Sequence, residues 1–247
     1  MANALYLRDA YLREFEATVT SSRPGEVELS ETAFYPAGGG QPCDVGTLHG
    51  PEATARRVTR VEKSAGRIVH AVEGETLPVG AKVRGSIDWA LRYAHMRYHT
   101  CLHILSGVVF HRFGSGITGG QIYPDRARMD LSLPEFSKEV VGEVVAEMNR
   151  VVERDLPIEV RFLSREEALR DPSLVRVASE LLPDVQEVRL IDIHGFDVQA
   201  DGGTHLRSTR EVGKVSLEKL ENKGARNKRL YLTVAPSTPG AAPPIHG

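Results

Sequence analysis

Two short motifs, about a hundred residues apart, contain the side chains that could do chemistry. In the first, His99-Thr-Cys-Leu-His103, two imidazoles are four residues apart within an apolar run, residues 96–113, that predicts a buried helix. Residues i and i+4 share one helix face, so both rings can point at one small object, and a metal ion is the usual reason. The second motif, Asp201-Gly-Gly-Thr-His205, adds a third imidazole and a carboxylate. Such ligands from two distant segments are typical of a catalytic zinc site that keeps an open position for water or substrate.

The histidine pair also has competing explanations. Two histidines at this spacing occur by chance in ordinary helices, so much of the metal prediction depends on the second motif. A zinc peptidase of the HExxH type needs a glutamate base directly after the first histidine, and Thr100 stands there instead. Peptidase chemistry is therefore disfavoured.

Together, the pattern H-T-x-x-H-x-L and the downstream G-G-T-H resemble the editing domain of alanyl-tRNA synthetase and its freestanding relatives, the AlaX alanyl-tRNA editing proteins. Three further segments resemble the medium-length type of that family, in the same order: the glycine-rich residues 32–46, the polar residues 209–213 and the basic residues 221–230. The resemblance covers the chain from about residue 5 to residue 235. It implies a small N-terminal β-barrel followed by an α+β editing domain of the threonyl/alanyl-tRNA synthetase type.

The resemblance also implies an activity, hydrolysis of the ester that joins a wrong amino acid to alanine tRNA. A pocket sized for alanine excludes glycine and serine only weakly, because one methyl or hydroxyl group contributes about 1–3 kcal/mol of discrimination. A second site that hydrogen-bonds the serine hydroxyl would release serine and spare alanine. The expected substrate is Ser-tRNA(Ala), with Gly-tRNA(Ala) as the second candidate, and the expected partner is the acceptor end of alanine tRNA.

The cofactor that the resemblance implies is one Zn²⁺ ion per chain, held by His99, His103, His205 and Asp201. The family usually has cysteine at the position of Asp201. The aspartate is either an oxygen ligand or a hydrogen-bonding partner of a histidine, with water as the fourth ligand. Cys101 points to the opposite side of the helix and is predicted to be a core residue. The zinc ion would either activate a bound water or orient the substrate.

The segment after the first helix, residues 116–123, matches the family's pocket-lining region by position. The match implies catalytic roles for Thr118 and Gln121, in meeting the serine hydroxyl or placing the water. The alternative is a polar turn that joins the helix to a strand. Arg128 and Asp130 match the family's Arg-x-Asp and are predicted to be structural.

Two segments are candidates for contact with tRNA. The loop Gly38-Gly39-Gly40-Gln41 permits close backbone approach, so it could contact the terminal adenosine or the pocket mouth, and a tight barrel turn is the alternative. Basic side chains crowd a predicted hairpin near the end of the chain: Lys223, Arg226, Lys228 and Arg229. They could hold tRNA phosphates, although solvated surface charge would produce the same pattern.

Composition is that of an ordinary soluble protein. The 247 residues are 41% apolar and 26% charged, with a formal net charge of −2. The chain has neither a signal-peptide pattern nor an apolar segment of membrane-spanning length, so no membrane association is expected. Two cysteines in unrelated contexts form no disulfide framework, which favours the cytoplasm.

Two functions compete with editing: a non-catalytic tRNA-binding protein with a structural zinc, and a zinc hydrolase of another small ester or amide. The oligomeric state is left open.

The N-terminal residues predict the small barrel that would carry the glycine loop. Short alternating runs separated by Gly, Pro and Ser turns occupy residues 14–20, 26–29, 67–72 and 82–87. The periodicity becomes helical between residues 88 and 92. The predicted domains are therefore the barrel over residues 1–88 and the zinc-binding editing domain over residues 89–235.

The second domain is predicted to be α+β, with helices beside a mostly antiparallel sheet. A helix over residues 134–154 would start at a capping box of Ser132 and Glu135, and Ser164 with Glu167 would cap a shorter helix. The buried stripe of the longer helix is expected at Phe136, Val140, Val144, Met148 and Val151. The predicted strands are residues 158–163 and 188–193, with residues 212–220 and 229–234 forming the basic hairpin. The tail, residues 236–247, is rich in Pro, Gly and Ala and is predicted to be disordered.

Overall fold

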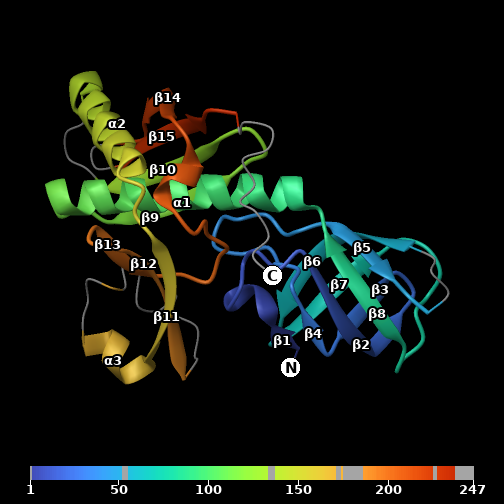
Figure 1. The fold of residues 1–247 in the computed structure, drawn as a ribbon. Coiled ribbons are helices and arrows are strands. Elements are labelled where there is room, and N and C mark those ends of the chain that lie inside the picture. Colours follow the sequence, from blue (N-terminus) through green and yellow to red (C-terminus); the bar gives the residue numbers. More distant parts are fainter. Residues whose placement is uncertain are drawn as a thin grey trace.

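The N-terminal strands close into a β-barrel, drawn in blue and cyan in Figure 1. The structure is a computed structural model and describes residues 2–51, 55–132, 137–170, 174, 186–224 and 227–236. The barrel strands pair in the order β2-β3-β7-β6-β5-β8. Their bounds are β2 Glu14–Arg23, β3 Glu26–Leu29, β5 Gly46–His49, β6 Ala55–Ser64, β7 Arg67–Val72 and β8 Lys82–Ile87. A short parallel pair, β1 (Asn3–Ala4) with β4 (Glu31–Thr32), and the 3-10 helix η1 (Leu5–Leu7) accompany them.

Alternating side chains explain why these residues form a barrel. Along β7, for example, Ile68, His70 and Val72 are buried while the residues between them are at least partly exposed. The inward-facing residues share one apolar core with Phe34 and Leu48. The predicted barrel and its four predicted strands are confirmed, with β2 three residues longer than expected.

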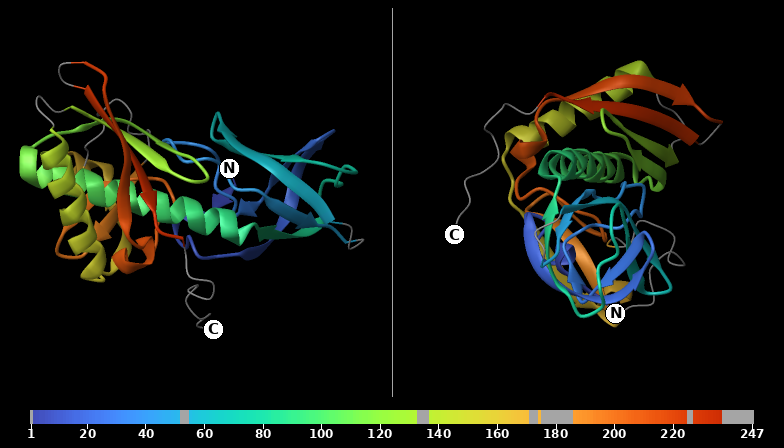
Figure 2. Two further views of the ribbon diagram at one scale, coloured as in Figure 1. Left: turned by 90° about the horizontal axis from the view of Figure 1, so that it is seen from above. Right: turned by 90° about the vertical axis from the view of Figure 1, so that its right-hand side faces the viewer.

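A long helix, α1 (Trp89–Phe113), follows the barrel and runs through the rest of the structure (Figure 1). Asp88 caps its start by accepting a hydrogen bond from the Leu91 N–H at 3.1 Å, and Gly114 ends it with a φ of 62°. The helix is buried on all sides through its middle. The right-hand view of Figure 2 looks along it and shows strands above and below. A helix in that position buries residues on all of its faces instead of on one stripe, and buried polar residues such as Arg92 and Thr100 have hydrogen-bond partners.

Two antiparallel sheets pack against α1. The larger has the order β14-β15-β10-β9, with β9 Ile117–Ile122, β10 Ala127–Ser132, β14 Val215–Asn222 and β15 Asn227–Val234. The smaller has the order β11-β12-β13, with β11 Ile158–Ser164, β12 Glu187–Ile193 and β13 Asp197–Ala200. Helix α2 (Lys138–Glu153) packs on α1 and β14, and α3 (Arg165–Arg170) packs on the smaller sheet. The α+β class is confirmed, with the strands divided between two sheets. Among the described residues, no helix combines the length and the apolar character needed to cross a membrane.

The predicted start of α2 is wrong by four residues. Ser132 pairs with Asn227 in the larger sheet, so it ends β10 and does not cap a helix. The N-cap is Ser137, whose hydroxyl accepts a hydrogen bond from the Val140 N–H at 3.3 Å. Glu135 and Phe136, both part of the prediction, lie outside the described residues. The buried stripe is Val141, Val144, Met148, Val151 and Val152. Val140, which was predicted to belong to it, is only half-buried.

The remaining predicted elements agree with the structure except at Val212. Ser164 and Glu167 form the predicted capping box, and the hairpin and the strands β11 and β12 are present. Val212, however, ends the 3-10 helix η4 (Thr209–Val212), because Ser208 and Glu211 cap that turn reciprocally. The chain passes from β8 to α1 at Asp88, although the predicted domain division stays a prediction. The predicted disordered tail lies outside the described residues beyond Pro236.

A buried ion pair joins the barrel to α1. The Arg92 side chain is fully buried, and its Nε donates to Asp44 Oδ1 at 2.9 Å. The same guanidinium donates to the carbonyls of Ala10 and Ala33 at 2.7 and 2.6 Å. Asp44 also accepts from the Tyr35 N–H at 2.6 Å. This network holds the loop that contains the four-residue glycine motif against the helix.

Candidate metal centre

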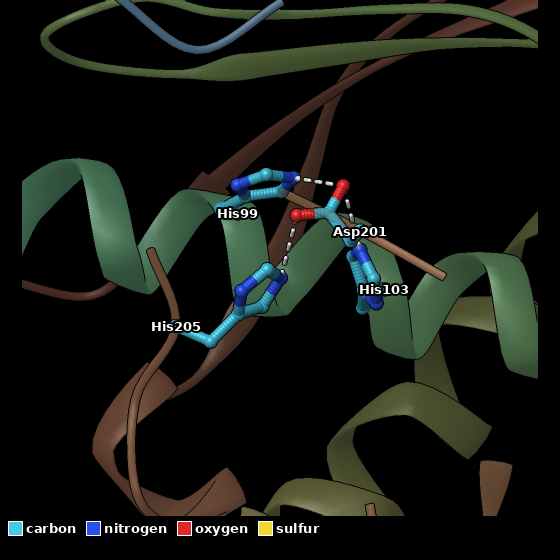
Figure 3. A group of neighbouring side chains, drawn as sticks. All are labelled: His99, His103, Asp201 and His205. Atoms are coloured by element: carbon cyan, nitrogen blue, oxygen red, sulfur yellow. Dashed lines mark ion pairs between the residues drawn. The ribbon is translucent and has the colours of Figure 1, made fainter. Parts of the chain in front are cut away.

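Four predicted metal ligands meet beside the middle of α1 (Figure 3). His99 and His103 extend from consecutive turns of the helix, and Asp201 and His205 extend from the loop that follows β13. One ligand atom from each side chain lies within 4.8 Å of the other three. The three histidines are buried, and the Asp201 side chain is 22% exposed. The tertiary structure therefore brings the two distant motifs to one place.

The spacing of these atoms suits a small cation. Asp201 Oδ2 is 3.5 Å from His99 Nε2 and 3.7 Å from His103 Nε2. Asp201 Oδ1 is 3.9 Å from His205 Nε2. In a tetrahedral zinc site with bonds of about 2.1 Å, ligand atoms are about 3.4 Å apart. Little movement would be needed for the four atoms to coordinate one ion.

His205 contributes a nitrogen without a hydrogen-bond partner to this group. Its Nδ1 lies 3.3 Å from the Gly203 carbonyl, which can only accept, so Nδ1 carries the proton. Its Nε2 is buried and has no hydrogen-bond partner among the described residues. An unpaired buried acceptor costs about 1–3 kcal/mol, and coordination of a cation would remove that cost. Three imidazole nitrogens and a carboxylate oxygen are donors that zinc accepts, so the group could hold a metal ion.

The electrostatics of the site favour cation binding. Burial raises the pKa of Asp201, but His99, His103 and His205 outweigh it and lower that pKa well below the usual range. Burial, together with the rings of His99 and His103, lowers the pKa of His205 well below its usual value. The site therefore presents a carboxylate and a neutral His205 at neutral pH, the forms that bind metal.

The loop that carries Asp201 and His205 is anchored by two residues whose roles the sequence did not reveal. Arg189 on β12 donates from Nη1 to the carbonyls of Asp201 and Gly203, each at 2.9 Å, and from Nε to the Leu7 carbonyl at 2.8 Å. Thr100, which occupies the position of a peptidase's glutamate, accepts a hydrogen bond from the Leu206 N–H at 3.1 Å. No sequence signal singled out Arg189, because the same strand also contains the charged residues Glu187 and Asp192.

The glycine loop of the barrel reaches this centre. The Gly40 carbonyl accepts a hydrogen bond from the Ile122 N–H at 2.8 Å, and a Cβ on Gly40 would overlap the Gly120 carbonyl. Gln41 is buried, and its Oε1 lies 2.8 Å from His99 Nδ1. The loop is thus wedged between the barrel, β9 and α1. Its predicted contact with the terminal adenosine stays a prediction.

Thr118 and Gln121 lie on strand β9, so the alternative of a simple polar turn is wrong. Thr118 is exposed, and the half-buried Gln121 donates from Nε2 to the Ile122 carbonyl at 3.2 Å. Neither side chain belongs to the group of ligand atoms. Their catalytic roles stay predictions.

The three predicted tRNA-binding cations of the hairpin that the structure describes have partners within the fold. Lys223 pairs with Glu221 at 2.9 Å, and Lys228 donates to Asn222 Oδ1 at 2.8 Å. Arg229 donates from Nε and Nη2 to the two Asp130 oxygens at 2.6 and 2.8 Å. This pairing agrees with the structural role predicted for Asp130, whereas Arg128 lies 3.6 Å from the same carboxylate. Arg226 lies outside the described residues.

Comparison with protein-family models gives two matches. Residues 4–91 match the model of class II (A) tRNA synthetases. Residues 188–231, which include Asp201 and His205, match the model of the threonyl and alanyl tRNA synthetase second additional domain. The α+β part is therefore of the threonyl/alanyl-tRNA synthetase type.

Individual relatives match over nearly the whole chain. The alanyl-tRNA editing protein AlaX-M of Saccharolobus solfataricus is 40% identical over 238 residues, which cover 96% of this chain and 100% of that protein. AlaX-M of Methanosarcina acetivorans is 41% identical over 95% of this chain and 99% of its own length. The alanine–tRNA ligase of Pyrococcus abyssi is 39% identical over 88% of this chain, which spans 24% of the ligase. Full-length similarity at this level, together with the barrel and the histidine centre, establishes that the chain belongs to the AlaX-M family of alanyl-tRNA editing proteins.

Proposed function

We propose that this protein is a trans-editing hydrolase that deacylates mischarged alanine tRNA at a zinc centre. Ser-tRNA(Ala) is the proposed substrate and Gly-tRNA(Ala) the second candidate. The observation that carries the proposal is the set of four ligand atoms, one of which is the unpaired His205 Nε2. The names of the full-length relatives, which are alanyl-tRNA editing proteins, support the substrate class.

The proposed ligands of one Zn²⁺ ion are His99, His103, Asp201 and His205. When bound, zinc supplies a Lewis acid that either lowers the pKa of a water or orients the amino group or hydroxyl of the substrate. The protein's contribution is to present these ligands already oriented. Cys101 is unsuited to act as a nucleophile, because it is fully buried and burial raises the pKa of its thiol to about 12.

Selectivity for serine needs polar groups that pair with its hydroxyl and lose that partner when alanine enters. We assign this task to β9, through Thr118 and Gln121. The strand is next to the glycine loop, because Gly40 and Gly120 are in contact. In this proposal Gly38, Gly39 and Gly40 border the place where the terminal adenosine binds.

The proposed partner is the acceptor end of alanine tRNA in the cytoplasm. The hairpin with Lys223, Arg226, Lys228 and Arg229 is the proposed phosphate-binding segment. Because the described cations of this hairpin already have partners, we expect it to contribute a few phosphate contacts instead of a broad basic surface.

Deacylation of Ser-, Gly- and Ala-tRNA(Ala) by purified protein tests this function. We expect cleavage of the serine or glycine ester, sparing of the alanine ester, loss of activity after chelation and recovery with Zn²⁺. His103→Ala should lower kcat/KM for the serine ester by at least about 100-fold. His194→Ala, which changes an exposed histidine outside the centre, should leave it unchanged.

Stoichiometric tRNA binding without cleavage of any ester would contradict the proposal. It would favour the competing function, a non-catalytic tRNA-binding protein with a structural zinc. Cleavage of small esters with no preference for aminoacyl-tRNA would favour a general zinc hydrolase.

A further inference from the structure

Gln41 is the contact between the barrel and the metal centre. The residue is 2% exposed, and its side chain bridges two segments of the α+β part. Oε1 lies 2.8 Å from His99 Nδ1 and 3.1 Å from the Thr204 backbone nitrogen, and Nε2 donates to Thr204 Oγ1 at 2.8 Å. One amide from the N-terminal barrel thus contacts both segments that supply metal ligands.

The orientation of this amide follows from its partners. A backbone N–H can only donate, so the Gln41 atom that faces the Thr204 N–H must be the oxygen. The same oxygen faces His99 Nδ1, and a carbonyl oxygen can only accept. His99 Nδ1 must therefore carry the proton, which leaves the lone pair on Nε2. His99 Nε2 is the atom that lies 3.5 Å from Asp201 Oδ2, on the side of the other ligands.

The position of Gln41 is itself tightly determined. The Tyr35 hydroxyl donates to the Gly38 carbonyl at 3.0 Å, and Gly40 is held against β9. On the other side, a Cβ on Gly203 would lie 2.8 Å from Gln41 Oε1, so the glycine there makes room for the amide. A side chain held from both sides can orient its partner.

His205 provides an internal comparison. Its Nδ1 faces the backbone carbonyl of Gly203, within its own loop, so its tautomer does not depend on the barrel. For His99, the described residues offer Nδ1 no hydrogen-bond partner besides Gln41. Replacement of Gln41 also removes its contacts with Thr204, but of the two tautomers only that of His99 depends on the amide. The tautomer of His205 should therefore stay in place.

We propose that Gln41 is a positioning residue, which fixes the tautomer and ring orientation of His99 so that Nε2 faces the metal. The barrel would then complete the metal centre in addition to any contact with tRNA. This inference rests on the proposed function, because it requires that His99 binds a metal. Partners of this kind typically change metal affinity by about 10- to 100-fold when they are removed.

The test compares Gln41→Met, which keeps the length of the side chain without its polar atoms, with Gln41→Glu, which keeps an acceptor. We expect Gln41→Met to bind Zn²⁺ about 10- to 100-fold more weakly in chelator competition, and Gln41→Glu to bind within a few-fold of wild type. In metal-free protein at a pH where the ring is neutral, ¹⁵N NMR should report the Nδ1–H tautomer of His99 in wild type. The Nε2–H tautomer should gain population in Gln41→Met, and His205 should keep its tautomer in both.

Each outcome decides the inference. Equal zinc affinity of wild type and Gln41→Met would overturn it while leaving the proposed zinc centre in place. An Nε2–H tautomer of His99 in metal-free wild type would also overturn it, and this measurement does not require that a variant folds. A wild-type protein that binds no metal would reject the zinc centre and the inference together.

Discussion

Gly203 lies so close to the imidazole of His99 that a Cβ on residue 203 would overlap the ring. The second glycine of the Asp-Gly-Gly-Thr-His motif is therefore required by a contact with the helix. The first glycine is under no such constraint, because a Cβ on Gly202 would meet no atom within 4 Å. The two neighbours form a matched pair for mutation.

Gly203→Ala should displace His99 and lower zinc affinity at least about tenfold, because the neighbouring ring and the Gln41 amide must both move. Gly202→Ala should leave zinc affinity within a few-fold of wild type. Chelator competition and zinc content after purification measure both variants. Equal losses in the two would mean that the motif needs glycine for backbone flexibility alone.

Replacement of Asp201 separates the two roles considered for its carboxylate. If it is a ligand, Asp201→Ala should lose zinc affinity at least about tenfold, whereas Asp201→Cys should retain zinc and shift preference from Mn²⁺ towards Cd²⁺, because thiolate is a softer donor. Competition titrations with the three metals test this. Unchanged zinc affinity in Asp201→Ala would instead favour water as the fourth ligand.

The buried pair of Arg92 and Asp44 should be a major contributor to the attachment of the barrel. Arg92→Ala leaves a buried carboxylate without its partner, so the free energy of unfolding should fall by about 3–5 kcal/mol. Arg60→Ala removes a pair whose side chains are 62% and 54% exposed and should cost at most about 1 kcal/mol. Urea denaturation monitored by circular dichroism compares them, and similar costs would contradict the assignment.

His70, inside the barrel, should make the stability depend on pH. Burial lowers its pKa to about 4 from an ordinary value of 6.5. Between pH 6.5 and pH 4 the unfolded chain binds more protons at this residue than the folded protein does. The full free energy of unfolding is therefore available above pH 6.5, and part of it is lost as the pH falls towards 4. The loss should amount to about 3 kcal/mol. The free energies of unfolding of wild type and His70→Gln, measured from pH 7 to pH 4, test this loss. An equal pH dependence of the two would exclude His70 as its cause.

Several features of this protein could be predicted from the sequence because they depend on neighbours along the chain. Alternation within β7 and β8 predicts strands, and the side chains of Ser164 and Glu167 cap a helix that begins between them. The i, i+4 spacing of His99 and His103 places both rings on one face wherever that helix lies. The motifs also carried the resemblance to the family, which the full-length relatives support.

Other features were decided by residues distant in the sequence. Ser132 was predicted to cap α2, but it pairs with Asn227 in the larger sheet, and Ser137 caps the helix instead. Arg229 of the hairpin looks like a free phosphate ligand until Asp130, about a hundred residues earlier, is placed beside it. The hydrophobic pattern predicts each element, but it does not predict which polar residue of another element will pair with a given side chain.

The sequence by itself determined the types of the proposed metal ligands, the helix that presents two of them and the fold class. Only the tertiary structure brought Asp201 and His205 to that helix and placed Gln41 against His99. The physical reason is that a hydrogen bond or a coordination site needs its atoms to be placed to within a few tenths of an ångström. That placement is set by the packing of whole elements against one another, which the periodicity of the sequence does not specify.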